Sequence, residues 1–138
     1  NINYYLALTE KAFGNAEKAQ QIVQSVIDSG QAFNVIYAEN DDMAKGAVAA
    51  LDKANISHGV GKDVIVMGFD CNKWALEELL NQNWNYDGQC NPYQASYIED
   101  VIKKLEAGET LDEKTIIMDE KGFDATTITQ DDVDQFGI

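Results

Sequence analysis

The most constraining stretch of this sequence is residues 34–51, where a strand pattern passes directly into a helix pattern. Residues 35–37 are β-branched or aromatic, which is typical of a buried strand. The polar turn at 39–41 follows, and apolar residues then recur with the period of a helix at Met43, Ala44, Ala47, Val48 and Leu51. Polar side chains therefore lie where a strand ends and a helix begins, which is where ligands bind in open α/β sheets.

The same arrangement recurs further along the chain. Residues 63–69 form an apolar strand pattern, and the polar turn Asp70-Cys71-Asn72 leads into a helix pattern over 73–81. Two strand ends, one supplying the amide of Asn40 and the other the carboxylate of Asp70, would form a polar site with both donors and acceptors.

Local patterns also predict the remaining elements. The additional strands are expected over residues 2–8, 85–90, 115–118 and 125–128. The additional helices are expected over 16–29 behind an Asn15 cap, from Asn91 (cap) and Pro92 (first residue) to Gly108, and over 130–136 behind a Thr129 cap. The alternation predicts an α/β fold, a three-layer Rossmann-like lobe whose parallel sheet carries helices on both faces.

Composition excludes several classes of function. A net charge of −14 over 138 residues argues against a nucleic-acid or anionic-membrane partner. No run approaches the roughly 18 apolar residues of a membrane span, and no signal peptide is visible at the start of the chain. The chain begins without Met, so we expect a mature form or a fragment.

Motifs for catalysis, metals and cofactors are not found. The G-x-S-x-G elbow, the G-x-x-x-x-G-K-[ST] loop and the G-x-G-x-x-G fingerprint are absent. Asp41 and Asp42 are adjacent, which fits helix capping better than acid–base chemistry. Cys71, Cys90 and His58 do not form a metal-binding pattern. We therefore expect no enzyme, no metal site and no cofactor.

The polar residues are better suited to binding a sugar. Sugar hydroxyls both donate and accept hydrogen bonds, which matches the amide of Asn40 and the carboxylate of Asp70. Trp74, Trp84 and Tyr93 could pack against sugar C–H faces. Each residue also has a structural alternative, which is helix capping for Asn40 and Asp70 and ordinary packing for the tryptophans.

Three segments resemble the type I periplasmic sugar-binding proteins of ABC transporters. They are residues 37–47, 64–70 and 90–92, and the resemblance extends over about 15–136. Relatives of this kind bind ribose, galactose or galactofuranose between two lobes joined by hinge strands. The resemblance implies that 1–138 is a single C-terminal lobe and that about 109–128 is a hinge or return segment.

The resemblance also implies partners and a location. They are a monosaccharide or related polar solute, an ABC transporter permease and an absent N-terminal lobe, in the periplasm or on a cell-surface lipoprotein. Asn40 and Asp70 match sugar-binding positions. The third position, two residues before Pro92, is Cys90, and its neighbours Gln89 and Asn91 are substitutes for it.

Two alternatives stay open. Cys71 and Cys90 would lie at neighbouring strand ends, either as a disulfide or as free thiols. The same fold also serves as the effector-binding domain of LacI-type transcriptional regulators, and that is the alternative function.

Overall fold

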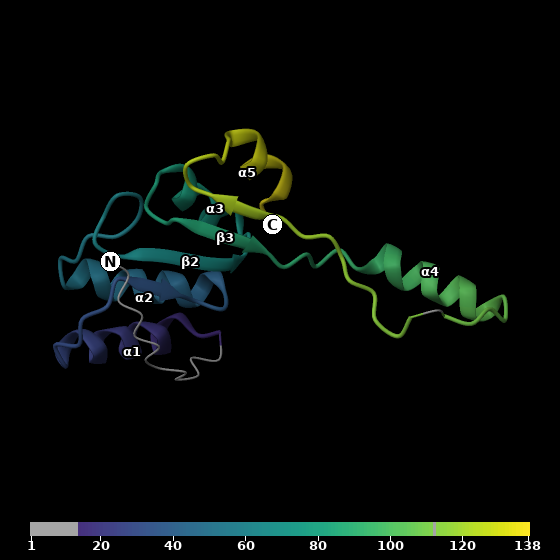
Figure 1. The fold of residues 1–138 in the computed structure, drawn as a ribbon, viewed down its shortest axis with the longest axis horizontal. Helices are drawn as coiled ribbons and strands as arrows, with labels where there is room; N and C mark the ends of the chain where they lie inside the picture. The colour runs from purple at the N-terminus through teal and green to yellow at the C-terminus, as the bar shows by residue number, and fades with distance from the viewer. Residues whose placement is uncertain (1–13, 112) are drawn as a thin grey trace.

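The computed structural model describes residues 14–111 and 113–138, so the strand predicted over 2–8 lies outside the described residues. Helices and strands alternate through most of this part of the chain (Figure 1). In chain order they are α1 (Ala16–Asp28), β1 (Val35–Tyr37), α2 (Asp41–Lys53), β2 (Ile65–Asp70), α3 (Lys73–Leu80), β3 (Tyr86–Gln89), α4 (Ala95–Glu106), β4 (Gly122–Asp124) and α5 (Gln130–Phe136).

The four described strands form one mixed sheet in the order β1-β2-β3-β4. β1, β2 and β3 are parallel, as the alternation predicts, whereas β4 is antiparallel to β3. The chain leaves the sheet after β3, runs through α4 and returns beside the strand from which it left (Figure 1). Because it returns from the same end, β4 must run in the opposite direction. The α/β class and the Rossmann-like lobe are confirmed.

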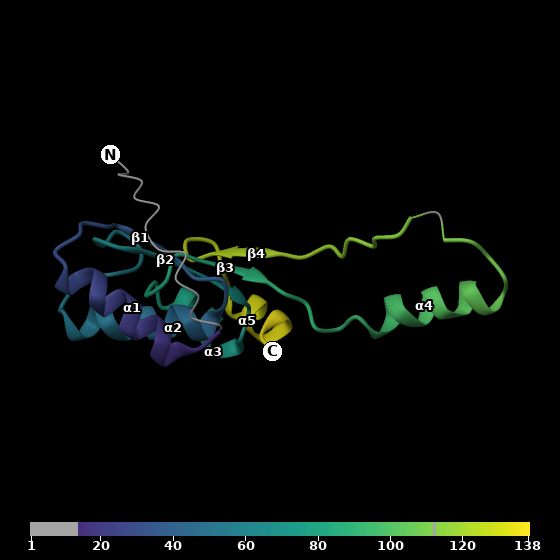
Figure 2. The same cartoon turned by 90° about the horizontal axis from the view of Figure 1, so that it is seen from below.

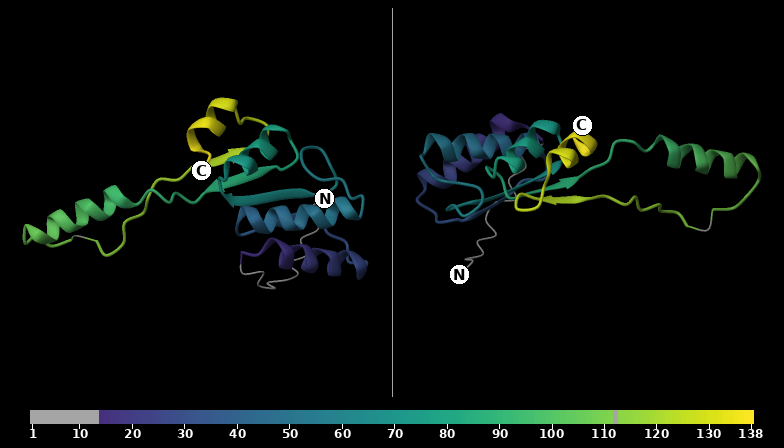
Figure 3. Two further views of the ribbon diagram at one scale, coloured as in Figure 1. Left: turned by 180° about the vertical axis from the view of Figure 1, so that it is seen from behind. Right: turned by 90° about the horizontal axis from the view of Figure 1, so that it is seen from above.

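The helices α1, α2, α3 and α5 lie on one side of the sheet, as Figures 2 and 3 show. The prediction placed helices on both faces, and among the described residues only this face carries them. The strand order gives the reason. Successive right-handed crossovers that move in one direction across a sheet place their helices on the same face, and both β1-α2-β2 and β2-α3-β3 move in this way.

The core lies between the sheet and these helices. Its largest fully buried side chains include Trp84, Leu51, Leu76, Leu79 and Val66. At its rim, Phe123 of β4 contacts Phe136 of α5, with ring centroids 5.4 Å apart. Among the described helices, none is both long and apolar enough to cross a membrane.

Three predicted helix starts are confirmed by their caps. The side chains of Asn15, Asn40 and Thr129 accept hydrogen bonds from backbone N–H groups in the first turns of α1, α2 and α5. Thr129 also forms a reciprocal capping box with Asp132.

The predicted start of α4 is wrong by three residues. Asn91 accepts a hydrogen bond from the backbone N–H of Tyr93 at 2.8 Å, and the helix begins only at Ala95. A bond to the residue two positions on forms an Asx turn, which is a local alternative to capping a helix.

Two predicted strands are also wrong. Residues 115–118 run without strand pairing, and residues 125–128 form a turn. Asp124 accepts a hydrogen bond from the backbone N–H of Thr126 at 2.8 Å, which closes this turn. Pairing with β3 therefore falls on Gly122–Asp124 instead.

Gly46 allows α1 and α2 to cross closely, and its replacement tests this contact. A Cβ at Gly46 would overlap the backbone carbonyl oxygen of Ala16. Glycine-to-alanine changes on open helix surfaces stabilise by about 0.5–1 kcal/mol. We expect Gly46→Ala instead to lower the free energy of unfolding by about 1–3 kcal/mol, measured by urea denaturation.

The exposed end of α2 provides the control for this substitution. Lys53→Ala should change the free energy of unfolding by less than about 0.5 kcal/mol. A Gly46→Ala protein that is as stable as the wild type would contradict the close crossing.

Candidate functional site

The polar side chains predicted to bind a ligand gather at the carboxyl ends of β1, β2 and β3. We call this region the carboxyl edge, defined by Asn40, Asp70, Asn72 and Gln89. Asn40 lies three residues beyond β1, while Asp70 and Gln89 end β2 and β3 and are paired in register. The parallel sheet therefore brings together residues up to 49 positions apart in sequence, from 40 to 89.

Asn40 has one structural role and one unused group. Its Oδ1 accepts a hydrogen bond from the backbone N–H of Met43 at 2.9 Å and so caps α2. Its Nδ2 has no hydrogen-bond partner among the described residues. The capping alternative is thus correct, and it leaves an amide N–H₂ group at the carboxyl edge as a donor for another molecule.

Asp70 lies in strained backbone at the end of β2. Its φ is 128° and that of Cys71 is 60°, so two successive non-glycine residues adopt positive φ. Such conformations cost about 1–3 kcal/mol each and gather at functional sites. The carboxylate is half-buried and has no hydrogen-bond partner among the described residues. Burial, and then the charge of Asp42, raise the pKa of Asp70.

The three residues at the end of β3 have different surroundings. Gln89 is half-buried, and its Oε1 accepts a hydrogen bond from the backbone N–H of Lys121 at 3.3 Å, so its amide N–H₂ group is the one left to donate. Cys90 is exposed. The side chain of Asn91 is engaged in its Asx turn, and its N–H donates to Glu120 at 2.7 Å. Of these three residues, Gln89 is the one that is paired in register with Asp70.

The aromatic candidates differ in packing and exposure. Trp84 is 1% exposed and belongs to the core, and Trp74 packs edge-on against it with ring centroids 5.8 Å apart. Lys45 Nζ lies 4.6 Å from the centroid of the Trp74 ring. Tyr93 is 71% exposed on the segment that leads to α4. Packing thus accounts for both tryptophans.

Both cysteines are free thiols, which agrees with the second of the two alternatives. Cys71 is buried and Cys90 is exposed. Within the described ranges, no three side chains of the types that bind metals are grouped together.

Two buried residues beneath the carboxyl edge were missed by the sequence analysis. Asp41 was assigned to the helix dipole, but its Oδ2 accepts hydrogen bonds from the backbone N–H of Asn72 at 2.8 Å and from its side chain at 3.1 Å. Asp87 lies in β3 with no exposed surface. The one available signal was a carboxylate inside a predicted strand, between Tyr86 and Gly88.

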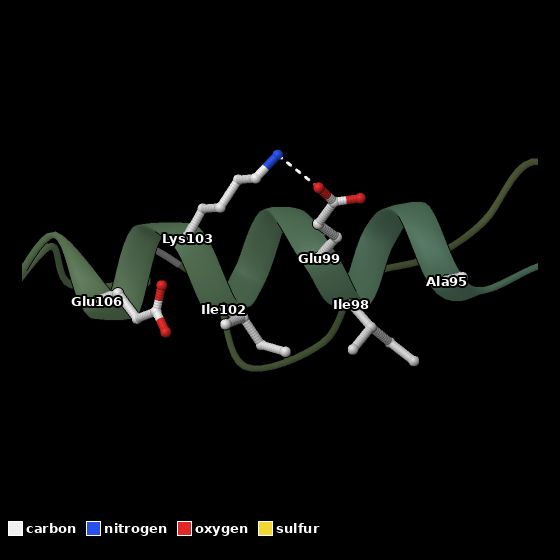
Figure 4. Close-up of a pocket in the computed structure, with 6 residues that line it drawn as sticks. All are labelled: Ala95, Ile98, Glu99, Ile102, Lys103 and Glu106. Atoms are coloured by element: carbon white, nitrogen blue, oxygen red, sulfur yellow. Dashed lines mark ion pairs between the residues drawn. The ribbon is translucent and has the colours of Figure 1, made fainter.

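Two shallow hollows in the described surface lie along α4, and Figure 4 shows one of them. Ile98 and Ile102 point to one side of this helix, and the ion pair between Lys103 and Glu99, 2.6 Å apart, lies on another side. The apolar lining does not resemble a polar ligand site.

Comparison with known proteins identifies the family. A family profile described as the periplasmic binding protein domain matches residues 4–110. The fructose import binding protein FruE of Bifidobacterium longum is 29% identical over 121 residues, which cover 86% of this chain and 36% of that protein. The galactofuranose-binding protein YtfQ of Escherichia coli is 26% identical over 100 residues, 70% of this chain and 31% of that protein. These relatives are binding proteins and not enzymes, as predicted.

Solved structures share the fold. A Mycobacterium smegmatis protein in complex with β-D-fucofuranose superposes with a TM-score of 0.69 at 27% identity, over 80% of this chain and 36% of that one. A galactofuranose-binding protein gives a TM-score of 0.75 at 22% identity, over 88% of this chain and 41% of that one. The chain spans about a third of the length of its curated relatives. It belongs to the periplasmic binding proteins, in the type I sugar-binding family.

Proposed function

We propose that this chain is the C-terminal lobe of the substrate-binding component of a sugar ABC importer, and that its carboxyl edge binds a monosaccharide. The observation that carries the proposal is the pair of free polar groups at adjacent strand ends. They are the amide Nδ2 of Asn40 and the carboxylate of Asp70, neither of which has a partner among the described residues.

The chemistry of these groups matches a sugar. The Asp70 carboxylate can accept hydrogen bonds from two neighbouring hydroxyls, and the amides of Asn40 and Gln89 can donate to hydroxyl or ring oxygens. The strained backbone at Asp70 fixes the point at the end of β2 from which its side chain leaves the chain. FruE and YtfQ are named for fructose import and galactofuranose binding.

Helix α4 supports the assignment to one lobe of two. Its exposed apolar residues include Ile98 (54%), Ile102 (48%) and Leu105 (54%), and none of its residues is buried. Figures 1 and 2 show it projecting from the sheet on two extended segments. An apolar helix face needs a partner. The proposed partner is the N-terminal lobe, and residues 109–128 would then include the return segment between the lobes.

The transport role follows from this assignment. A sugar between two lobes stabilises the closed form through its higher affinity for that form, and the closed protein would deliver the sugar to an ABC transporter permease outside the cytoplasm, from the periplasm or as a cell-surface lipoprotein. FruE is named as an import binding protein, which favours this function over the effector domain of a LacI-type regulator.

Thermal shift of the full-length protein against pentoses, hexoses, polyols and furanose sugars tests the site, because a bound ligand raises the melting temperature. Asn40→Ser retains the capping oxygen but removes the amide donor. Asp70→Asn removes the charge. A hydrogen bond to a charged group contributes about 1.5–3 kcal/mol, so Asp70→Asn should raise Kd roughly 10- to 150-fold.

The cap of α5 supplies the control for general destabilisation. Thr129→Ala should lower stability by about 1 kcal/mol and leave the sugar Kd unchanged. If no sugar raises the melting temperature, or if Asn40→Ser and Asp70→Asn bind as tightly as the wild type, the proposed site is wrong.

Substitutions on α4 test the second lobe. In the full-length protein, Ile102→Glu should lower the free energy of unfolding by at least about 2 kcal/mol, because an isoleucine that packs against the other lobe becomes a buried charge. Lys104→Ala is the control, because it changes the net charge by the same amount on the opposite side of α4. It should have little effect on the free energy of unfolding. Equal melting temperatures for the two variants would contradict docking through this face.

A further inference from the structure

Two carboxyl groups are buried together directly beneath the carboxyl edge. Asp41 begins α2 and Asp87 lies in β3, and each side chain has 0% exposed surface. Neither is in an ion pair within the described part of the chain. If both carboxyl groups were ionised, two unpaired negative charges would be buried side by side at a large cost in free energy. The protonation state of the two groups therefore needs a physical explanation.

The strands bring these two groups together. Asp87 is paired in register with Gly68 of β2. A Cβ at Gly68 would lie 2.6 Å from Oδ1 of Asp41, so the absence of a side chain makes room for the Asp41 carboxyl group above this strand. Because Asp87 is the register neighbour of Gly68, its carboxyl group faces the same space, and the influence of each group on the other's pKa includes a side-chain hydrogen bond.

The hydrogen bonds around the pair leave one oxygen of each group without a partner. Oδ2 of Asp41 accepts both hydrogen bonds from Asn72. Oδ1 of Asp87 accepts a hydrogen bond from the thiol of Cys71, with Sγ at 3.8 Å. The remaining oxygens, Oδ1 of Asp41 and Oδ2 of Asp87, are buried and accept no hydrogen bond from an N–H or O–H donor of the described residues. Two carboxyl oxygens form a hydrogen bond only when one of them carries a proton.

We propose that Asp41 and Asp87 share one proton in the folded protein at neutral pH, carried on Oδ2 of Asp87 and donated to Oδ1 of Asp41. Asp87 is then a positioning residue. It holds the Asp41 carboxylate against Asn72, and this bond joins the start of α2, which carries Asn40, to the turn after β2, which carries Asp70. The proposal goes beyond sugar binding, because proton sharing does not depend on any ligand.

The hydrogen bonds decide which group carries the proton. Burial raises the pKa of Asp41 as well, but the bonds to Asp87 and to the two N–H donors of Asn72 oppose this rise and favour the ionised form of Asp41. Asp87 receives the backbone N–H of Cys71, which lowers its pKa, and the weak thiol donor of the same residue. Burial, and then the negative charge of Asp41, raise the pKa of Asp87 to about 9. Burial and Asp87 also raise the pKa of the Cys71 thiol, which therefore remains protonated and donates.

The neighbouring elements supply no positive charge to replace the proton. Asp70 at the end of β2 adds a further negative charge. Phe123 of β4, opposite Asp87 in the sheet, is apolar. Two lysines on the surrounding helices are engaged elsewhere, Lys73 of α3 with Asp134 of α5 at 3.1 Å and Lys45 of α2 over the Trp74 ring.

A shared proton makes stability depend on pH in a defined direction. Between the ordinary pKa of an aspartate, about 4, and the raised value, the folded protein retains a proton that the unfolded chain has released. The unfolded state therefore binds fewer protons, and stability falls as pH rises through this range. Asp87→Asn should remove this dependence, because an amide donates to Asp41 and accepts from Cys71 without a proton to lose.

The test is urea denaturation of the wild type and of Asp87→Asn at pH 5 to 8. The quantity compared is the folding equilibrium constant of Asp87→Asn divided by that of the wild type. One retained proton predicts that this ratio rises about tenfold per pH unit. Asp100→Asn removes the same charge from an exposed position on α4, and its ratio should change less than about threefold over the range. A ratio for Asp87→Asn that does not rise with pH would overturn the proposal.

A second measurement needs no variant. Infrared or carbon NMR spectra of the wild type with labelled aspartate should show one protonated carboxylic acid at pH 7 that ionises near pH 9. If the spectra at pH 7 show ionised aspartates and no protonated carboxylic acid, both groups are charged and something other than a proton bridges them. This result would also overturn the proposal, and neither measurement depends on whether a sugar binds.

Discussion

The parallel pairing of β1, β2 and β3 is the constraint on which the rest of this structure depends. Parallel strands end at the same edge, so Asn40, Asp70 and Gln89 meet there although they are far apart in sequence. The right-handed crossovers that parallel strands require then place α2 and α3 on one face. The carboxyl edge and the one-sided helical layer therefore have the same cause.

The carboxyl edge is held by groups that are themselves buried. Asp41 bonds to both N–H groups of Asn72, which connects α2 to the turn after β2. Gly68 gives Asp41 the space for this approach. Beneath the exposed polar groups of this edge lies a layer of buried polar contacts. This layer maintains the positive φ of Asp70 and Cys71, because strained backbone persists only where its surroundings fix it.

The projecting helix α4 shows that one chain can contain both a folded core and a helix with an exposed apolar side. Apolar residues recur at helical spacing in its sequence, and the structure shows that its apolar side does not contact the sheet. Its first turn was predicted incorrectly because Asn91 can form either a cap or an Asx turn, and the local sequence does not distinguish them. The short strand β4 was misplaced for a related reason, since its position depends on pairing with β3.

The sequence by itself determined the α/β class, the starts of α1, α2 and α5, and the two strand–turn–helix units that carry Asn40 and Asp70. These features depend on local periodicity and capping, which neighbouring residues encode. Only the tertiary structure decided that Gln89 lies beside Asp70, that Trp84 is core, and that Asp41 and Asp87 meet in the interior. Those facts depend on strand register and helix packing, which join residues distant in the chain and so leave no local pattern.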